Sequence, residues 1–373
     1  MSGIYIHIPY CSQACYYCDF HFSTNLKTRS ELVNCLIEEI KLQKNFLSSK
    51  KLNTIYFGGG TPSILTENEL AEIFEVLNDS YDYEGAEITF EANPDDLSLE
   101  KLKIIKSFGI NRLSIGTQSF DEKILKYFNR SHNSNQAVES IKMAQNQGLD
   151  NISLDLIYGI PNQSLDDFKI DIGKALDLDT KHISAYCLTI EPKTVFGKWH
   201  EENKLTPVDE GLAAEQFELL IETLGASGFQ HYEISNFAKE GFESQHNSNY
   251  WFGDSYLGIG PGAHSFNGNQ RHYNISNNIK YIQSIKKQTI PATIENLNPQ
   301  QKFNEFLLTR IRTSRGVDLI EMSNKLGMSL LTESKNKIDL YLKQELILID
   351  RNVLRLSNKG KLFADKITED LMI

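Results

Sequence analysis

The sequence predicts an α/β fold: an incomplete (β/α)6 TIM-like barrel followed by a C-terminal winged-helix-like module. Three observations predict it. Six short β-rich runs alternate with helical patterns in the first 230 residues, and glycines or polar residues follow most of these runs. Beyond about residue 290, helical patterns precede an alternating apolar pattern that is typical of a hairpin.

The six β-rich runs are dense in Ile, Leu, Tyr or Phe, which is typical of parallel strands buried on both faces. We expect these strands at Ile4–Ile8, Thr54–Phe57, Glu87–Glu91, Arg112–Gly116, Ile152–Tyr158 and His182–Thr189. Six units suffice for a partial barrel and fall short of a closed eightfold one.

Helical patterns fill the gaps between these runs. Thr66 begins a capping-box pattern before the apolar-periodic run Leu70–Leu77. Leu99–Phe108 is amphipathic, and Gly109 after it is a typical helix end. Ser164 opens another helix in the same way as Thr66. Strands that alternate with helices indicate a parallel sheet with right-handed crossovers.

Residues that can bind or react gather where the strands end. The three clustered cysteines follow the first run, Gly58-Gly59-Gly60-Thr61 follows the second, Glu91 ends the third, Gln118 follows the fourth, and Asp155 is expected near the end of the fifth. The carboxyl ends of parallel strands carry the active sites of α/β barrels and open α/β sheets. We therefore expect one site at this edge.

The periodic pattern weakens after about residue 229. Residues 236–275 are rich in Gly, Asn, Ser and aromatic residues and predict loops with short elements. Further on, a helix around Gln300–Ile311 and an apolar hairpin pattern at Leu346–Leu356 predict the winged-helix-like module. Three domains are expected: the partial barrel at 1–230, an aromatic-rich connector at 231–290 and the C-terminal module at 291–373.

The composition is that of an ordinary globular protein, with 40% hydrophobic residues, 23% charged residues and a net charge of −11. Such an acidic chain is a poor general polyanion binder, so we expect no nucleic-acid partner. No run approaches the roughly 18 apolar residues of a membrane-spanning helix, and the N-terminus lacks the pattern of a signal peptide. We expect a cytoplasmic location, with peripheral membrane contact left open.

Three of the five cysteines fall within eight residues, at Cys11, Cys15 and Cys18. An odd number of cysteines in a large chain argues against a disulfide framework. Three thiolates on a 4Fe–4S cluster leave one iron open, which can bind the amino and carboxylate groups of S-adenosylmethionine. The alternatives are structural zinc, for which His7 or His21 would have to complete the ligand set, and three inert thiols.

Taken together, the motifs resemble the radical S-adenosylmethionine superfamily and, within it, the oxygen-independent coproporphyrinogen III oxidase-like family. The matching segments are Tyr5–Cys11, the cysteine triplet with Tyr17, Gly58–Pro62, Glu91, Arg112–Gln118, Asn129-Arg130 and Asp155–Pro161. They run in order through more than half of the chain. The resemblance implies that Cys11, Cys15 and Cys18 hold a 4Fe–4S cluster.

The resemblance also implies a set of S-adenosylmethionine contacts. Gly59, Gly60 and Thr61 match a turn that contacts the amino-acid part of the cofactor, and Tyr5 and Tyr17 match positions beside the cofactor. Glu91 suits the ammonium or the ribose of the cofactor. Gln118, Arg130 and Asp155 match residues of a second cofactor site in the oxidases. Taken alone, the glycines indicate a tight turn, the tyrosines core packing, and Glu91 equally a structural ion pair.

Two departures favour the haem-chaperone branch of this family. Where the oxidases carry another cysteine, two residues past the third ligand, this chain has Phe20, and the longer N-terminal extension of the oxidases is missing. The segment from His246 to Tyr250-Trp251 has the His-Asn-x-x-Tyr-Trp pattern of the branch, and His264 also matches it. The resemblance implies haem at His246, Tyr250 and Trp251, whereas alone these residues would pass as a loop histidine packed on aromatic rings.

The expected function is therefore haem binding and delivery to an acceptor protein of unidentified nature, with the 4Fe–4S cluster and S-adenosylmethionine as regulatory or structural partners. The main alternative is an enzyme that decarboxylates two propionates of coproporphyrinogen III through a 5′-deoxyadenosyl radical. A third hypothesis is a radical enzyme that acts on another substrate.

Overall fold

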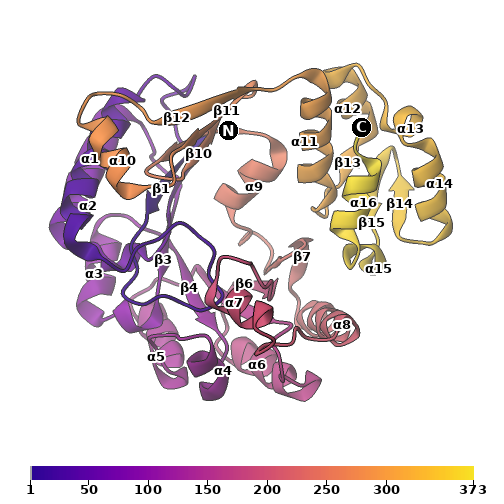
Figure 1. Cartoon of the computed structure of the whole chain (residues 1–373), viewed down its shortest axis with the longest axis horizontal. Helices are drawn as coiled ribbons and strands as arrows, with labels where there is room; N and C mark the ends of the chain where they lie inside the picture. Colours follow the sequence, from indigo (N-terminus) through magenta and orange to yellow (C-terminus); the bar gives the residue numbers. More distant parts are fainter. Residues whose placement is uncertain (1) are drawn as a thin grey trace.

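The computed structural model describes residues 2–373 and contains one large sheet and one small sheet (Figure 1). Six parallel strands lie side by side in chain order in the large sheet. They are β1 (Ser2–Ile8), β2 (Thr54–Gly59), β3 (Glu87–Ala92), β4 (Arg112–Gln118), β5 (Ile152–Tyr158) and β6 (His182–Cys187). The predicted α/β class is confirmed.

Helices cover the outer face of these strands, as Figure 1 shows for the rim from α1 to α6. They are α1 (Arg29–Leu42), α2 (Glu67–Ser80), α3 (Leu99–Ser107), α4 (Glu122–Tyr127), α5 (Ser134–Asn146), α6 (Leu165–Asp177) and α8 (Glu210–Ala226). Helix α7 (Val195–Glu201) packs instead against Tyr16 and Tyr127. The capping boxes expected at Thr66 and Ser164 are both formed. Gly109, with φ +75°, follows α3 as expected.

The two faces of the strands differ in chemistry. The apolar residues of each strand, such as Ile6, Phe57 and Leu113, pack with the helices in one large hydrophobic cluster. Their neighbours along each strand point to the inner face because side chains alternate. Those neighbours are largely polar, namely Tyr5, His7, Thr54, Tyr56, Thr89, Glu91, Arg112, Ser114, Ser153 and Asp155. The strands are buried on both faces, as expected, yet the inner face is a polar one.

The segment expected as a connector contributes directly to the large sheet. It contains β7 (Gln230–Glu233), β8 (Asn236–Ala238), α9 (Gln245–Phe252), β9 (Ser255–Ile259), β10 (His264–Phe266), β11 (Gln270–Asn274) and α10 (Asn278–Ile285), and β12 (Ala292–Asn296) follows. Strand β9 pairs in parallel with β1, and β10 to β12 continue the sheet in antiparallel pairs. The sheet has β12 and β7 at its edges, so the barrel is open.

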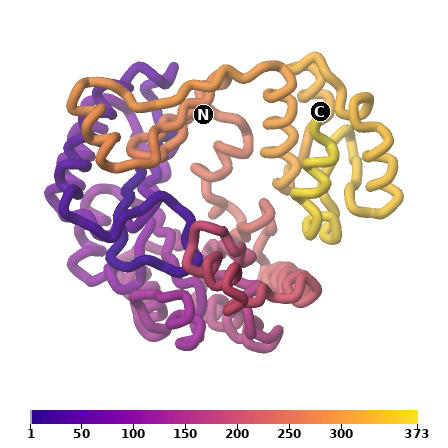
Figure 2. The backbone as a smooth tube through the Cα atoms, viewed as in Figure 1, coloured from indigo at the N-terminus to yellow at the C-terminus, as the bar shows by residue number. Residues whose placement is uncertain are grey.

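The C-terminal residues have their own core and lie beside the open side of the barrel (Figure 2). They form α11 (Pro299–Ile311), β13 (Val317–Asp318), α12 (Leu319–Leu326), α13 (Leu330–Glu333), α14 (Lys335–Lys343), β14 (Ile347–Asp350), β15 (Val353–Leu356), α15 (Asn358–Lys361) and α16 (Ala364–Leu371). The strand order is β13-β15-β14. Within residues 2–373, no helix is both long and apolar enough to cross a membrane.

A buried carboxylate fastens the added strands to α1. Glu39 accepts hydrogen bonds from the Gly260 backbone N–H at 2.7 Å, from Asn274 Nδ2 at 2.7 Å and from the Tyr281 hydroxyl. Burial raises the pKa of Glu39 to about 7, and these hydrogen bonds act in the opposite direction. The interactions join α1 to the β9–β10 turn, β11 and α10.

Replacing Glu39 with alanine should therefore lower the free energy of unfolding by about 2–4 kcal/mol, because three buried donors lose their acceptor. Urea unfolding followed by circular dichroism measures the change. Its neighbour Glu38, which is paired with Lys41 at the surface, is the matched control. Glu38→Ala should change stability by no more than about 0.5 kcal/mol. Equal effects of the two substitutions would show that Glu39 is not a fastening point.

Candidate functional site

The three clustered cysteines lie in the loop that follows β1. Two backbone hydrogen bonds join the ends of this loop. The Cys11 N–H donates to the Ser23 carbonyl at 3.1 Å, and the Ser23 N–H donates to the Pro9 carbonyl at 2.9 Å. Cys11, Cys15 and Cys18 are free thiols and partly exposed. The loop therefore presents three thiols at the carboxyl end of the first strand.

The turn after α4 holds this loop from the opposite side. Asn129 Nδ2 donates to the Ala14 carbonyl at 2.8 Å. Arg130 donates from Nη1 to the Cys15 sulfur at 3.3 Å, and from Nη2 to Asn93 Oδ1 at 2.8 Å and the Gly116 carbonyl at 2.7 Å. Arg130 thus both fixes the loop and places a positive charge at it.

The donor set fits a cluster better than a single zinc ion. Among residues 2–373, no three His, Cys, Asp or Glu side chains lie close enough to share one metal ion, which is what a zinc site requires. Thiolates bound to separate irons of a cluster need not converge in this way. Burial raises the pKa values of Cys11 and Cys18 to about 11. Metal binding must therefore displace their protons.

The glycine turn after β2 packs against the cysteine loop. A Cβ on Gly60 would lie 2.7 Å from the carbonyl oxygens of Ile8 and Tyr10, and the Thr61 N–H donates to the Tyr10 carbonyl at 2.8 Å. Gly59 has φ +105°, a conformation that favours glycine. The lack of a side chain at Gly60 thus allows the turn to pack directly against the backbone of the cysteine loop.

Glu91 lies one residue before the end of β3 and joins this turn. Its carboxylate accepts from the Tyr56 hydroxyl at 2.7 Å and from the Gly59 N–H at 3.1 Å. Burial raises the pKa of Glu91 to about 7. Next to it, the Tyr5 hydroxyl lies 3.0 Å from His7 Nδ1. The structure therefore brings Gly59 and Glu91 together, and Tyr5, in the middle of β1, lies near them.

The residues expected at a second cofactor site meet only in part. Gln118 ends β4 with φ +68°. Gln118 and Arg130 both lie next to Gly116: a Cβ on Gly116 would be 3.0 Å from Gln118 Nε2 and 3.2 Å from Arg130 Nη2. The expectation that Asp155 lies near the end of its strand is wrong: it is the central residue of β5. Its carboxylate is within 3.4 Å of the Ser114 and Ser153 hydroxyls, and burial raises its pKa to about 6.

The aromatic motif is helical, which corrects the expected loop. His246, Tyr250 and Trp251 lie on α9, which Ser244 caps at one end and Gly253 ends in a left-handed conformation. His246 is 2% exposed, and burial lowers its pKa to about 3, so the imidazole is neutral. Its Nδ1 lies 2.8 Å from Thr54 Oγ1, and its Nε2 lies 3.0 Å from the Tyr250 hydroxyl.

Helix α9 lies at the opposite end of the strands from the cysteines. Thr54 and Glu87 are the first residues of β2 and β3, and the Glu87 carboxylate accepts the N–H groups of Gln245 at 3.1 Å and His246 at 3.0 Å. The helix therefore covers the amino end of the sheet. The Tyr5 ring lies between the two ends, 6.4 Å from the His246 ring and 5.9 Å from the His7 ring.

Haem fits this motif only in part. A neutral imidazole suits haem iron, and Trp251 has a buried indole N–H without a partner among the described residues. Both nitrogens of His246 are, however, engaged in hydrogen bonds. His264, the other histidine of the pattern, is exposed on β10 and stacks on Tyr273 with 5.7 Å between the ring centroids.

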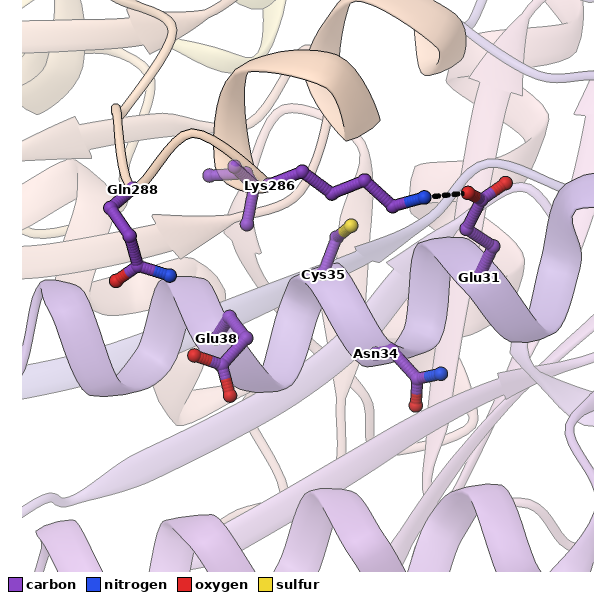
Figure 3. A pocket seen from close by; sticks show the side chains of 7 residues that line it. Glu31, Asn34, Cys35, Glu38, Lys286 and Gln288 are labelled. Carbon is purple, nitrogen blue, oxygen red and sulfur yellow. Dashed lines mark hydrogen bonds and ion pairs between the residues drawn. The ribbon is translucent and has the colours of Figure 1, made fainter.

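A separate surface pocket lies between α1 and α10 (Figure 3). Cys35 lies in it beside Lys286, which pairs with Glu31. None of the residues predicted for a cofactor lines this pocket. Cys187, the remaining cysteine, is exposed at the end of β6.

Comparison with known proteins decides the family. The model of the radical SAM superfamily matches residues 5–173, and that of the HemN C-terminal domain matches residues 297–363. The chain is 35% identical to the heme chaperone HemW of Bacillus subtilis, over 98% of both chains. It is 32% identical to the heme chaperone HemW of Lactococcus lactis, over 100% of this chain and 97% of the relative. The chain belongs to the HemW family of radical SAM proteins.

The solved structures agree with this family at the level of the fold. Coproporphyrinogen III oxidase (HemN) from Escherichia coli superposes with a TM-score of 0.86 at 20% identity and covers 100% of this chain and 90% of its own. At that identity the likeness shows a shared fold alone. The predicted family is confirmed, and membership of the HemW family supports the predicted cofactor classes, a 4Fe–4S cluster, S-adenosylmethionine and haem.

Some residues that shape the site carried no sequence signal of their own. Asn129 was visible only as part of a family motif, yet it holds the cysteine loop. Thr54 and Glu87 were visible only as strand residues, yet they fix α9. Arg112 was also expected only as part of a strand. It is 1% exposed on the polar inner face, and its Nε has no hydrogen-bond partner within residues 2–373.

Proposed function

We propose that this protein binds haem and delivers it to an acceptor protein, and that it carries a 4Fe–4S cluster with S-adenosylmethionine at its open iron. The likeness to relatives named heme chaperone HemW over nearly the whole chain carries this proposal. The sequence has no cluster of basic residues of the kind that binds nucleic acid, and its net charge is −11. Both features favour a protein over a nucleic acid as the acceptor, and we propose that the acceptor lies in the cytoplasm.

For the cluster, we propose Cys11, Cys15 and Cys18 as the three ligands, with Arg130 holding Cys15. When bound, the cluster supplies an open coordination position and a one-electron carrier. We propose that the residues around the loop hold S-adenosylmethionine: Gly59, Gly60, Thr61, Tyr5, Tyr17 and Glu91, with Gln118, Arg130 and Asp155 toward a second position. The buried Glu91 carboxylate, already hydrogen-bonded at the turn, suits the cofactor's ammonium or ribose hydroxyls.

For haem, we propose the face of α9 that carries His246, Tyr250 and Trp251. The neutral imidazole and the partly exposed rings of Tyr250 and Trp251 support this assignment. Since both nitrogens of His246 are hydrogen-bonded, ligation of iron requires one of these two bonds to open. An acceptor protein, and loose contact with a membrane surface, remain parts of the proposal that the fold alone does not specify.

The alternative function is oxidative decarboxylation of coproporphyrinogen III. The shared fold with the oxidase from Escherichia coli favours it. Against it stands Phe20, which is 75% exposed where the oxidases are expected to carry a cysteine beside the cluster loop.

One anaerobic preparation tests both functions. After reconstitution with iron and sulfide, the protein should retain about one haem per chain and give it up to an apo-haemoprotein. The same sample, with S-adenosylmethionine and a strong reductant, should form no protoporphyrinogen IX beyond a single turnover. Steady turnover would replace the chaperone assignment with the oxidase, and failure to retain haem would remove it.

A further inference from the structure

The His246 imidazole is held from two sides by groups that differ in exposure. On the Nδ1 side stands Thr54 Oγ1, at 2.8 Å, from a strand residue with no exposed surface. On the Nε2 side stands the Tyr250 hydroxyl, at 3.0 Å, one helical turn along α9. Tyr250 keeps some exposure, whereas Thr54 lies inside the sheet.

The surroundings of Thr54 make its position rigid. Asn249 Nδ2 donates to Thr54 Oγ1 at 3.3 Å, and Thr54 pairs in register with Gly3 on β1 and Glu87 on β3. A Cβ on Gly3 would lie 2.5 Å from Thr54 Oγ1 and 3.3 Å from His246 Nδ1, so the glycine leaves just enough room for the pair. The strand pairing fixes the backbone of Thr54, and the bonds to Asn249 and His246 hold its hydroxyl against Nδ1.

Chemistry then distinguishes the two nitrogens. A neutral imidazole that binds iron through one nitrogen carries a proton on the other, and that N–H needs an acceptor that keeps the ring oriented. Thr54 Oγ1 has two lone pairs, of which Asn249 uses one, so it can accept the Nδ1 proton. The Tyr250 hydroxyl meets Nε2 from the more exposed of the two sides, so Nε2 becomes available to a metal once this one hydrogen bond opens.

Resting on the proposed haem function, we propose that Thr54 is the positioning residue of the haem site: it holds His246 Nδ1, so that Nε2 is the nitrogen offered to iron in place of the Tyr250 hydroxyl. This assigns opposite roles to the two partners of His246. Thr54 supports ligation, and the Tyr250 hydroxyl competes with it.

The test compares haem titrations and spectra of the full-length protein. Thr54→Val keeps the side-chain shape and removes the acceptor, so haem affinity should fall about tenfold, the low end of the effect of removing such a partner, and the Soret band should shift. Thr54→Ser should restore both. Tyr250→Phe keeps the ring and removes the competing hydroxyl, so haem affinity should rise.

Thr89→Val is the matched control. Thr89 is equally buried on the neighbouring strand, and its hydroxyl has no partner among the described residues. This substitution should leave affinity and spectrum as in the wild type. Unchanged binding in well-folded Thr54→Val would overturn the proposal, and so would a tenfold loss in Tyr250→Phe, which remains decisive if Thr54→Val does not fold. Wild-type protein that binds no haem would instead contradict the proposed function.

Discussion

Replacement of any one of Cys11, Cys15 and Cys18 with alanine is expected to abolish the iron–sulfur cluster and to leave the fold intact. In the proposed cluster each thiolate would bind a different iron, so the loss of one would leave two irons without a protein ligand. The loop loses one contact at most, the bond from Arg130 to the Cys15 sulfur, because backbone bonds to Ser23 and the side chain of Asn129 still hold it. Iron content should fall from about four per chain to near zero.

Iron analysis, the cluster's visible absorbance and electron paramagnetic resonance measure this effect. In wild-type protein, S-adenosylmethionine should change the resonance spectrum of the reduced cluster. Cys35→Ala and Cys187→Ala are the controls, since Cys35 lies against α10 and Cys187 at the end of β6, and both should keep full iron. Stoichiometric zinc without iron after anaerobic reconstitution would contradict the cluster assignment.

The second large effect is expected at His246. Replacing it with alanine should weaken haem binding by about 100-fold or more, because even the loss of an outer partner of a metal ligand costs about 10- to 100-fold. The Soret band should shift, and the iron of the cluster should remain, since the cysteines lie at the opposite end of the strands. Haem titration, visible spectra and iron analysis of the same protein give the three readouts.

His246 is also a buried packing residue, so its removal has a structural effect of its own. His182 offers a close match: it is fully buried, with Nδ1 at 2.8 Å from Ser153 Oγ and Nε2 at 2.7 Å from the Tyr232 hydroxyl. Each alanine substitution should lower stability by about 1–3 kcal/mol, but His182→Ala should keep haem binding. If the two variants lose haem to the same degree, or if folded His246→Ala keeps it, His264 becomes the next candidate.

Local sequence signals predicted many of the helices, strands and turns of this protein well. The structure confirms strand β5 at its expected bounds, α2 with its Thr66 capping box, and the hairpin of β14 and β15 with its turn at Arg351 and Asn352, both with positive φ. These features depend on residues within a few positions of one another. Side-chain alternation and capping act at that range, so one chain suffices to recognise them.

The site was predicted less completely, since its contacts join distant segments. Nothing near Arg130 indicated that it would reach Cys15, 115 residues earlier. Likewise, the His246 segment is rich in polar residues and was expected as a loop. It forms a helix that Ser244 caps and Gly253 ends, and Glu87, 159 residues away from His246, accepts two further N–H groups at its start.

The sequence alone therefore determined the order of the six parallel strands and the helices between them, the triplet Cys11, Cys15 and Cys18, and the family to which the chain belongs. The tertiary structure decided which residues face one another: a polar inner face, a cysteine loop held by Arg130, and a histidine enclosed between Thr54 and Tyr250. The physical reason is range. Periodicity along the chain shows which face of a helix or strand is buried. Which residues that face contacts depends on segments far away in the sequence, which come together only when the whole sheet has formed.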